Sequence, residues 1–201
     1  MAADSADRAE GNRIVRALRI LRLPLAAAGL AAAAYFGALQ WTGNVHTVLP
    51  GVLYRSATLP AADFEKLLVD DHIETVINLR GRHSGDAWYQ QEREIAERHG
   101  VRLVDLSWSA ARELTDTKVE EFYGAAAAAR GPVLIHCRAG ADRTGLAVAL
   151  FLAHVTHSSE EDAEAQLSIR YGHIGIPLLS WAYAMNQTFE RLEPSLDYYG
   201  L

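Results

Sequence analysis

Short apolar runs alternate with longer amphipathic stretches along most of this 201-residue chain. Short runs of this kind predict buried strands, and longer stretches with apolar residues three and four positions apart predict helices. The predicted strands are 51–56, 74–79, 101–106 and 133–136, and the predicted helices are 60–71, 86–100, 115–130, 144–156, 159–171 and 177–192. The alternation predicts an α/β domain whose parallel-dominated central sheet is flanked by helices on both faces.

The composition restricts the classes of protein to which the chain can belong. Half of the residues are hydrophobic and 22% are charged, which fits a packed core. The net charge of −6 gives no basis for general nucleic-acid binding. Cys137 is the only cysteine, so no intramolecular disulfide forms, and the CxxC and HExxH spacings of metal sites do not occur. We expect no nucleic-acid partner, no metal and no cofactor, and the oligomeric state does not follow from the sequence.

The first 45 residues differ in character from the rest. No charged residue occurs from Leu23 to Val45, and Trp41 lies near the far end of this stretch. Arginines precede it at steps of three, at Arg13, Arg16, Arg19 and Arg22. A cationic flank, an uncharged stretch of this length and a terminal aromatic residue predict an N-terminal transmembrane helix over about 23–43. The predicted organisation is a basic N-terminus with a membrane anchor (1–45) followed by a globular domain (46–201).

This arrangement predicts a single-pass protein with its N-terminus in the cytoplasm and its domain on the extracytoplasmic side. Two alternatives are open. The uncharged stretch can be a cleaved signal peptide, which gives a secreted or periplasmic protein. It can also be an alanine-rich helix packed on a cytoplasmic domain, with the arginine stripe as its solvated face.

The single cysteine lies in a segment that can hold an anion. In "VLIHCRAGADRTG", residues 133–145, Cys137 follows the last predicted strand and a helix begins near Thr144. Ligands of parallel sheets bind beyond the carboxyl ends of the strands. A tight loop there aims successive backbone N–H groups inward, and the helix N-terminus adds partial positive charge. This field binds an oxyanion and favours the thiolate form of Cys137, which is the nucleophilic form.

Three further residues of the segment suit phosphate. Gly140 permits a backbone conformation that a side chain resists. Arg143 can grip two oxygens of a tetrahedral anion, and Thr144 can stabilise the thiolate as a leaving group. Taken singly, Cys137 is a small buried residue, Gly140 a turn and Arg143 a surface charge. Taken together, they predict a phosphate site with a nucleophile in it.

The series His136, Cys137, five residues, Arg143 and Thr144 resembles the signature loop of the cysteine-dependent protein tyrosine and dual-specificity phosphatases, in their bacterial form. "LYRSATLP", "TVINLRG" and "IRYGH" are also similar to segments of these enzymes, and the resemblance covers about residues 46–190. It implies a phosphatase-like fold and a two-step hydrolysis of phosphate monoesters. Cys137 attacks phosphorus to form a phosphocysteine, which water then hydrolyses, while Arg143 and the loop amides hold the developing charge.

Enzymes of this group protonate the leaving oxygen with an aspartate, and the sequence offers three. Asp105 ends a predicted strand in the usual region upstream of the cysteine. Asp116 is explained equally well as a helix N-cap. Asp142 lies inside the loop, directly before Arg143, in a Gly-x-Asp-Arg arrangement that resembles some bacterial phosphatases. We favour Asp142 over Asp105 as the acid; the alternative is that Asp142 orients Arg143 or binds loop amides.

The substrate class stays open at this point. Phosphotyrosine, phosphoserine or phosphothreonine proteins are the expected substrates, and a membrane-lipid phosphate, such as a phosphoinositide or phosphatidylglycerophosphate, is the alternative. Arg138 matches one of two lysines in the loop of lipid phosphatases, whereas Ala141 does not match the other. A third alternative is an inactive module that binds phosphorylated partners. The residues expected to bind the substrate are His136, Arg138, Ala139, Gly140, Ala141 and Arg80.

Overall fold

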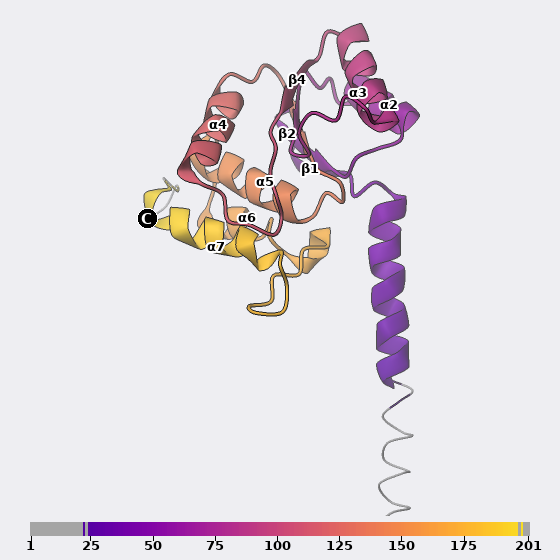
Figure 1. Cartoon of the computed structure of the whole chain (residues 1–201), viewed down its shortest axis with the longest axis vertical. Coiled ribbons are helices and arrows are strands. Elements are labelled where there is room, and N and C mark those ends of the chain that lie inside the picture. The colour runs from indigo at the N-terminus through magenta and orange to yellow at the C-terminus, as the bar shows by residue number, and fades with distance from the viewer. Residues whose placement is uncertain (1–21, 23, 197, 199–201) are drawn as a thin grey trace, which may run out of the picture. The chain divides into compact units, whose positions relative to one another are not determined.

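The computed structural model describes residues 22, 24–196 and 198. Within these residues one five-stranded sheet has helices on both of its faces (Figure 1). The strands are β1 (His46–Leu49), β2 (Leu53–Ser56), β3 (Thr75–Asn78), β4 (Arg102–Asp105) and β5 (Val133–His136). The helices are α2 (Ala61–Asp70), α3 (Ala87–Arg98), α4 (Asp116–Ala127), α5 (Asp142–His154), α6 (Glu160–Glu164) and α7 (Tyr183–Leu192), with short 3₁₀ turns at Ile169–Tyr171 and Glu193–Ser195. The predicted α/β class is confirmed.

The strand order is β1-β2-β5-β3-β4, and all neighbours are parallel except β1 and β2. The last residues of the four parallel strands stand in register: Ser56 beside His136, His136 beside Asn78, and Asn78 beside Asp105. These strands therefore finish together, and the loops that follow them meet at one edge of the sheet.

Alternate residues of each strand face opposite sides of the sheet, and each side has its own apolar core. Leu53 and Ile77 pack with residues of α4, α5 and α7. Their neighbours Tyr54 and Val76, together with Leu134, pack with residues of α2 and α3. Helix α5 is buried along almost its whole length, so the loop that precedes it is tied to the centre of the domain.

Three element predictions need correction. Strand β1 was not predicted; it is a four-residue edge strand joined to β2 through a turn at Gly51, which has a positive φ of 70°. The helix expected over 159–171 is only the short α6, and a continuous helix cannot form there because the Ser168 backbone is extended, with φ −133° and ψ 163°. The helix expected over 177–192 begins at Tyr183, since Leu178 adopts a left-handed conformation with φ 64°.

The N-terminal helix is present; within the described residues it includes Arg22 and residues 24–41. The chain divides after Ala38 into this N-terminal unit and the domain. Among the described residues, no helix is both long enough and apolar enough to span a bilayer, so the anchor predicted over 23–43 is not supported. The predicted basic arginine stripe lies outside the described residues, apart from Arg22.

Candidate active site

The loop of residues 137–141 joins the end of β5 to the start of α5. Its backbone carbonyl groups accept hydrogen bonds from residues that lie outside the loop. Thr58 donates twice, from Oγ1 to the Cys137 carbonyl at 3.2 Å and from its backbone N–H to the Arg138 carbonyl at 3.4 Å. The Asn44 side chain donates from Nδ2 to the Ala139 carbonyl at 3.0 Å. Asn44 is itself buried and is thus a fixed support.

The second half of the loop is held by Arg55 and by the helix. Arg55 donates from NH2 to the Gly140 carbonyl at 2.9 Å and to the Ala141 carbonyl at 3.5 Å. The Gly145 N–H donates to the same Ala141 carbonyl at 2.7 Å, as in the first turn of a helix. All five loop carbonyls therefore have donors on their outer side.

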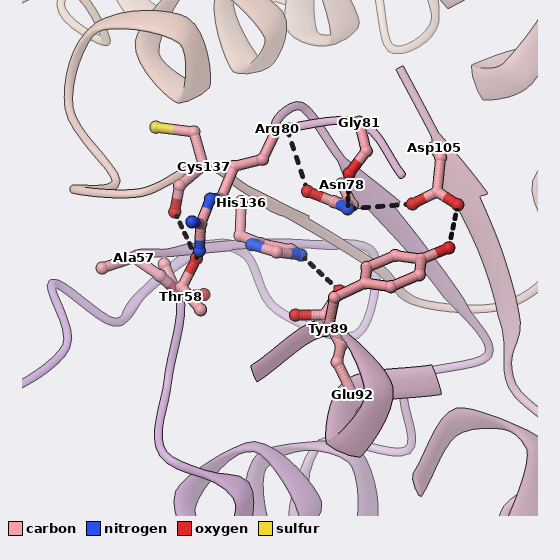
Figure 2. Close-up of polar contacts among 11 residues, drawn as sticks. Ala57, Thr58, Asn78, Arg80, Gly81, Tyr89, Glu92, Asp105, His136 and Cys137 are labelled. Atoms are coloured by element: carbon pink, nitrogen blue, oxygen red, sulfur yellow. Dashed lines mark hydrogen bonds and ion pairs between the residues drawn. The ribbon is translucent and has the colours of Figure 1, made fainter. Parts of the chain in front are cut away.

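A trans peptide points its N–H in the direction opposite to its C=O. Because the carbonyls of residues 137–141 point outward to their donors, the N–H groups of residues 138–142 point to the opposite, inner side. Figure 2 shows the Cys137 sulfur directed away from the Cys137 carbonyl that Thr58 binds. The sulfur and five amide N–H groups thus face the same side, at the N-terminus of α5, which is the arrangement of an oxyanion site.

Gly140 is required by this loop for two reasons. Its φ is +69°, a value that side chains disfavour. A Cβ atom at this position would lie 2.6 Å from the Ala57 nitrogen and 2.7 Å from the Ser56 carbonyl carbon. The loop therefore presses directly on the end of β2, and any side chain at Gly140 would push it away.

Arg55 is the support that the sequence reasoning missed. It is fully buried in β2, and its guanidinium stacks on Tyr171, 3.8 Å from the ring centroid. NH1 donates to the Gln166 side-chain oxygen at 2.8 Å, in addition to the loop contacts of NH2. Burial lowers the pKa of Arg55 to about 10, so it remains a cation at neutral pH. Among the described residues, no carboxylate pairs with it; its partners are carbonyl oxygens and a ring.

Cys137 and Thr144 lie at the base of the site. The Cys137 side chain is buried, with the residue 2% exposed, and its thiol is free. The Thr144 hydroxyl is buried and has no hydrogen-bond partner among the described residues. An unpaired buried hydroxyl in the first turn of α5 can donate to a group in the loop.

Three arginines, Arg80, Arg138 and Arg143, lie near one another at this edge of the sheet. Arg143 donates from NH1 to the carbonyls of Leu79 and Trp108, at 3.2 and 3.3 Å, which sets the direction of its guanidinium. Arg80 donates from NH1 to Thr58 Oγ1 at 2.9 Å. Burial, and then the charge of Arg143, lowers the pKa of Arg80. Arg138 is exposed beside them. Cations that repel one another in this way are stabilised by a bound anion.

His136 does not lie on the inner side of the loop. Its ring is buried against α3, with Nε2 3.1 Å from Oε1 of the buried Glu92 (Figure 2). The histidine before the cysteine therefore packs beneath the sheet edge, and its contact with Glu92 fixes the end of β5 relative to α3.

Asp105 is enclosed by its own donors. Asn78 donates from Nδ2 to Oδ1 at 2.8 Å, and Tyr89 donates its hydroxyl to Oδ2 (Figure 2). Arg82 Nε also lies 3.7 Å from Oδ2. Two strand spacings of about 4.8 Å separate β4 from β5, so the Asp105 backbone lies about 10 Å from the strand that carries the cysteine. The structure brings Asp105 to the correct edge but engages both of its oxygens elsewhere.

Asp142 is the first residue of α5 and is partly exposed. Its Oδ1 lies 2.7 Å from Nδ1 of His173, which is buried. The other ring nitrogen, Nε2, lies 2.8 Å from Oδ1 of Asn186. Asp116 instead lies at the start of α4, where its carboxylate pairs with Arg191 at 2.7 Å. Of the three aspartates, Asp142 alone is part of the loop–helix junction.

The residues that sequence reasoning missed share one property: they act through side chains that the loop pattern does not contain. These are Asn44, Arg55, Thr58, Glu92 and His173. Their only sequence signal is that "LYRSATLP" and "IRYGH" hold three of them, Arg55, Thr58 and His173.

The chain matches the model of a family described as the tyrosine phosphatase family, over residues 36–164. No curated protein sequence matches the chain. Among solved structures, TpbA of P. aeruginosa is 32% identical, with a TM-score of 0.51 and coverage of 66% of this chain and 77% of TpbA. A cysteine-to-serine variant of TpbA in complex with pTyr is 30% identical, with a TM-score of 0.50 and coverage of 66% and 76%.

One more distant structure shares the fold alone. PTPMT1 in complex with PI(5)P is 18% identical, with a TM-score of 0.52 and coverage of 75% of this chain and 97% of PTPMT1. The match over more than half of the chain establishes the family.

Proposed function

We propose that this chain, which belongs to the tyrosine phosphatase family, hydrolyses phosphate monoesters through a phosphocysteine at Cys137. The observation that supports it most strongly is the outward fixation of all five loop carbonyls, which turns five N–H groups toward the side of the sulfur. Such donors bind a phosphoryl group and also stabilise the charge that grows on its equatorial oxygens in the transition state. The same field stabilises the thiolate that must attack.

In the first step, the Cys137 sulfur forms a bond to phosphorus as the bond from phosphorus to the leaving oxygen breaks. Arg143, directed by the carbonyls of Leu79 and Trp108, supplies a planar pair of donors to the phosphoryl oxygens. The buried Thr144 hydroxyl is available to donate to the sulfur when it becomes the leaving group of the second step.

Asp142 is our candidate for the general acid and base. It adjoins Arg143 in the chain, its side chain is partly exposed, and its contact with His173 engages Oδ1, which leaves Oδ2 for the substrate. Asp105 is less suited, because Asn78 and Tyr89 already occupy its two oxygens.

The substrate that we favour is phosphotyrosine in a protein. The supporting observation is the likeness to TpbA, whose variant was crystallised in complex with pTyr. An aryl phosphate also requires less from the acid than an alkyl phosphate does, because a phenolate is a better leaving group than an alkoxide.

A phospholipid phosphate is the second candidate, and one surface feature favours it. Leu178, Leu179 and Trp181 are 104%, 84% and 81% exposed, in the loop that follows His173. No Asp, Glu, Lys or Arg occurs from Tyr171 to Phe189. An uncharged, exposed apolar loop beside a phosphate site suits contact with a lipid surface.

Phosphate release from p-nitrophenyl phosphate tests the proposed reaction. A panel of substrates then tests whether the chain acts on protein or lipid phosphates. We expect the purified chain to release phosphate and Cys137→Ser to release none. Binding of the ester without turnover by either protein would support an inactive phosphate-binding module instead. A phosphotyrosine peptide should then be hydrolysed with a higher kcat/KM than phosphatidylglycerophosphate or PI(5)P in vesicles; the reverse order would establish the lipid candidate.

A further inference from the structure

The hydrogen-bond geometry around His173 requires a proton in its contact with Asp142. His173 is 3% exposed, and both of its ring nitrogens face oxygen atoms: Oδ1 of Asp142 at 2.7 Å and Oδ1 of Asn186 at 2.8 Å. An amide oxygen cannot donate, so Nε2 carries a hydrogen. The contact between Nδ1 and Asp142 then requires a second hydrogen, which lies on one atom or the other.

Loss of that second hydrogen would leave two acceptors facing each other. The bare Nδ1 of the buried ring and the partly exposed, ionised carboxylate would then stand 2.7 Å apart and repel each other. The contact as it stands therefore contains one proton shared between the two side chains.

Gly175 keeps the histidine and the amide in place. A Cβ atom at Gly175 would lie 2.0 Å from Asn186 Oδ1 and 2.8 Å from His173 Nε2. The backbone at Gly175 thus closes over the contact between the ring and the amide, and neither group has room to turn away on that side.

We propose that His173 is a positioning residue that stores, together with Asp142, the proton needed by the leaving group. The proposal rests on the phosphatase function proposed above. In the first step the sulfur–phosphorus bond forms, the phosphorus–oxygen bond breaks, and the leaving oxygen takes the proton of the pair. In the second step a water oxygen bonds to phosphorus, the electron pair of the sulfur–phosphorus bond returns to sulfur, and one water proton restores the pair.

A comparison of two leaving groups separates this role from a structural one. Phenolate needs a proton far more than p-nitrophenolate does. We expect His173→Gln to lower kcat for phenyl phosphate about 100-fold but kcat for p-nitrophenyl phosphate less than about threefold, because general acid catalysis contributes about 10²–10⁴-fold where it is needed. A structural defect in the loop lowers both rates by the same factor.

Two further variants make the test decisive. Asn186→Ala removes the oxygen that fixes Nε2 but leaves the contact with Asp142, so we expect a smaller change in the ratio of the two rates, in the same direction. His46→Gln is the matched control: His46 Nε2 contacts Asn44 Oδ1 at 2.9 Å behind the loop, and its loss should lower both rates equally.

Equal losses on both substrates in His173→Gln, or no loss on either, would overturn the proposal. If thermal melting shows that His173→Gln does not fold, the ratio in Asn186→Ala decides, and an unchanged ratio overturns the proposal. A parent protein that hydrolyses neither ester would overturn the phosphatase function itself, and this inference with it, which is a result distinct from an active parent with an unchanged ratio.

Discussion

Asp105 and Asp142 both stand at the carboxyl edge of the sheet, yet their polar surroundings differ. At the end of β4, Asp105 receives donors on both oxygens, from Asn78, Tyr89 and Arg82. At the start of α5, Asp142 meets a histidine through Oδ1. Both carboxylate oxygens of Asp105 have hydrogen-bond donors, whereas at Asp142 only Oδ1 contacts His173, and the residue adjoins the loop with its inward N–H groups.

The difference shows how a carboxylate that supports a fold is distinguished from one that is available for chemistry. Donors on every oxygen fix the side chain and leave no acceptor position for a substrate. A contact with a second titratable group that shares a proton leaves the carboxyl able to give that proton up. Both aspartates satisfy a sequence criterion for the general acid; the hydrogen-bond partners separate them.

Among the variants that test this contrast, Asp142→Asn is expected to have the largest effect. Asparagine keeps the size of the side chain but has no proton to give at this position. We expect kcat for phenyl phosphate to fall by about 10²–10³-fold, with a much smaller fall for p-nitrophenyl phosphate. An unimpaired Asp142→Asn would remove the contrast between the two aspartates.

The second effect concerns Arg55, the buried arginine that donates to the loop carbonyls. In Arg55→Met the carbonyls of Gly140 and Gln166 lose their buried donor, and we expect the free energy of unfolding to fall by about 3 kcal/mol. Urea denaturation measures it. Arg138→Met, on the exposed side of the same loop, is the matched control and should cost less than about 0.5 kcal/mol. Similar values for the two variants would contradict the assignment of Arg55 as the support.

The third effect tests the hydrogen-bond partners of Asp105. We expect Asp105→Asn to lower the free energy of unfolding by about 1 kcal/mol, since the Tyr89 hydroxyl and Arg82 lose a charged acceptor. Its kcat on phenyl phosphate should change by less than about threefold. A large loss of kcat that is confined to the poor leaving group would instead identify Asp105 as the acid.

The smallest effect is a pH dependence of stability that is due to His46. Burial, and then the charge of Arg55, lowers the pKa of His46. The unfolded chain therefore binds a proton at a higher pH than the folded chain does, so stability falls as the pH drops through the ordinary histidine pKa of about 6.5. We expect Tm to decrease between about pH 7 and pH 5, and the decrease to be shallower in His46→Gln. Identical slopes would mean that His46 does not contribute.

The sheet, the central helices and the loop were accessible from the sequence, because period-two strands and period-3.6 helices leave a pattern in consecutive residues. Cys137, Gly140 and Arg143 were accessible for the same reason: they lie within seven positions of one another. β1 was not accessible, since four residues at the edge of a sheet carry too little pattern.

The supports of the loop were inaccessible for a different reason. Arg55 and Gly140 are separated by 85 positions, and Asp142 and His173 by 31, so each contact depends on the completed fold. Nothing in the sequence distinguishes a buried arginine that binds carbonyls from an exposed one. His136 shows the converse: its place beside the cysteine indicates substrate binding, but its ring packs on Glu92.

Trapping of the covalent intermediate tests the central claim most directly. The protein would be mixed with p-nitrophenyl phosphate, quenched in acid within a turnover, and digested for mass spectrometry. We predict a phosphoryl group on the peptide that contains Cys137, and its absence in Cys137→Ser. Release of phosphate at the parent rate with no phosphorylated Cys137, or with the phosphoryl group on another residue, would contradict the account.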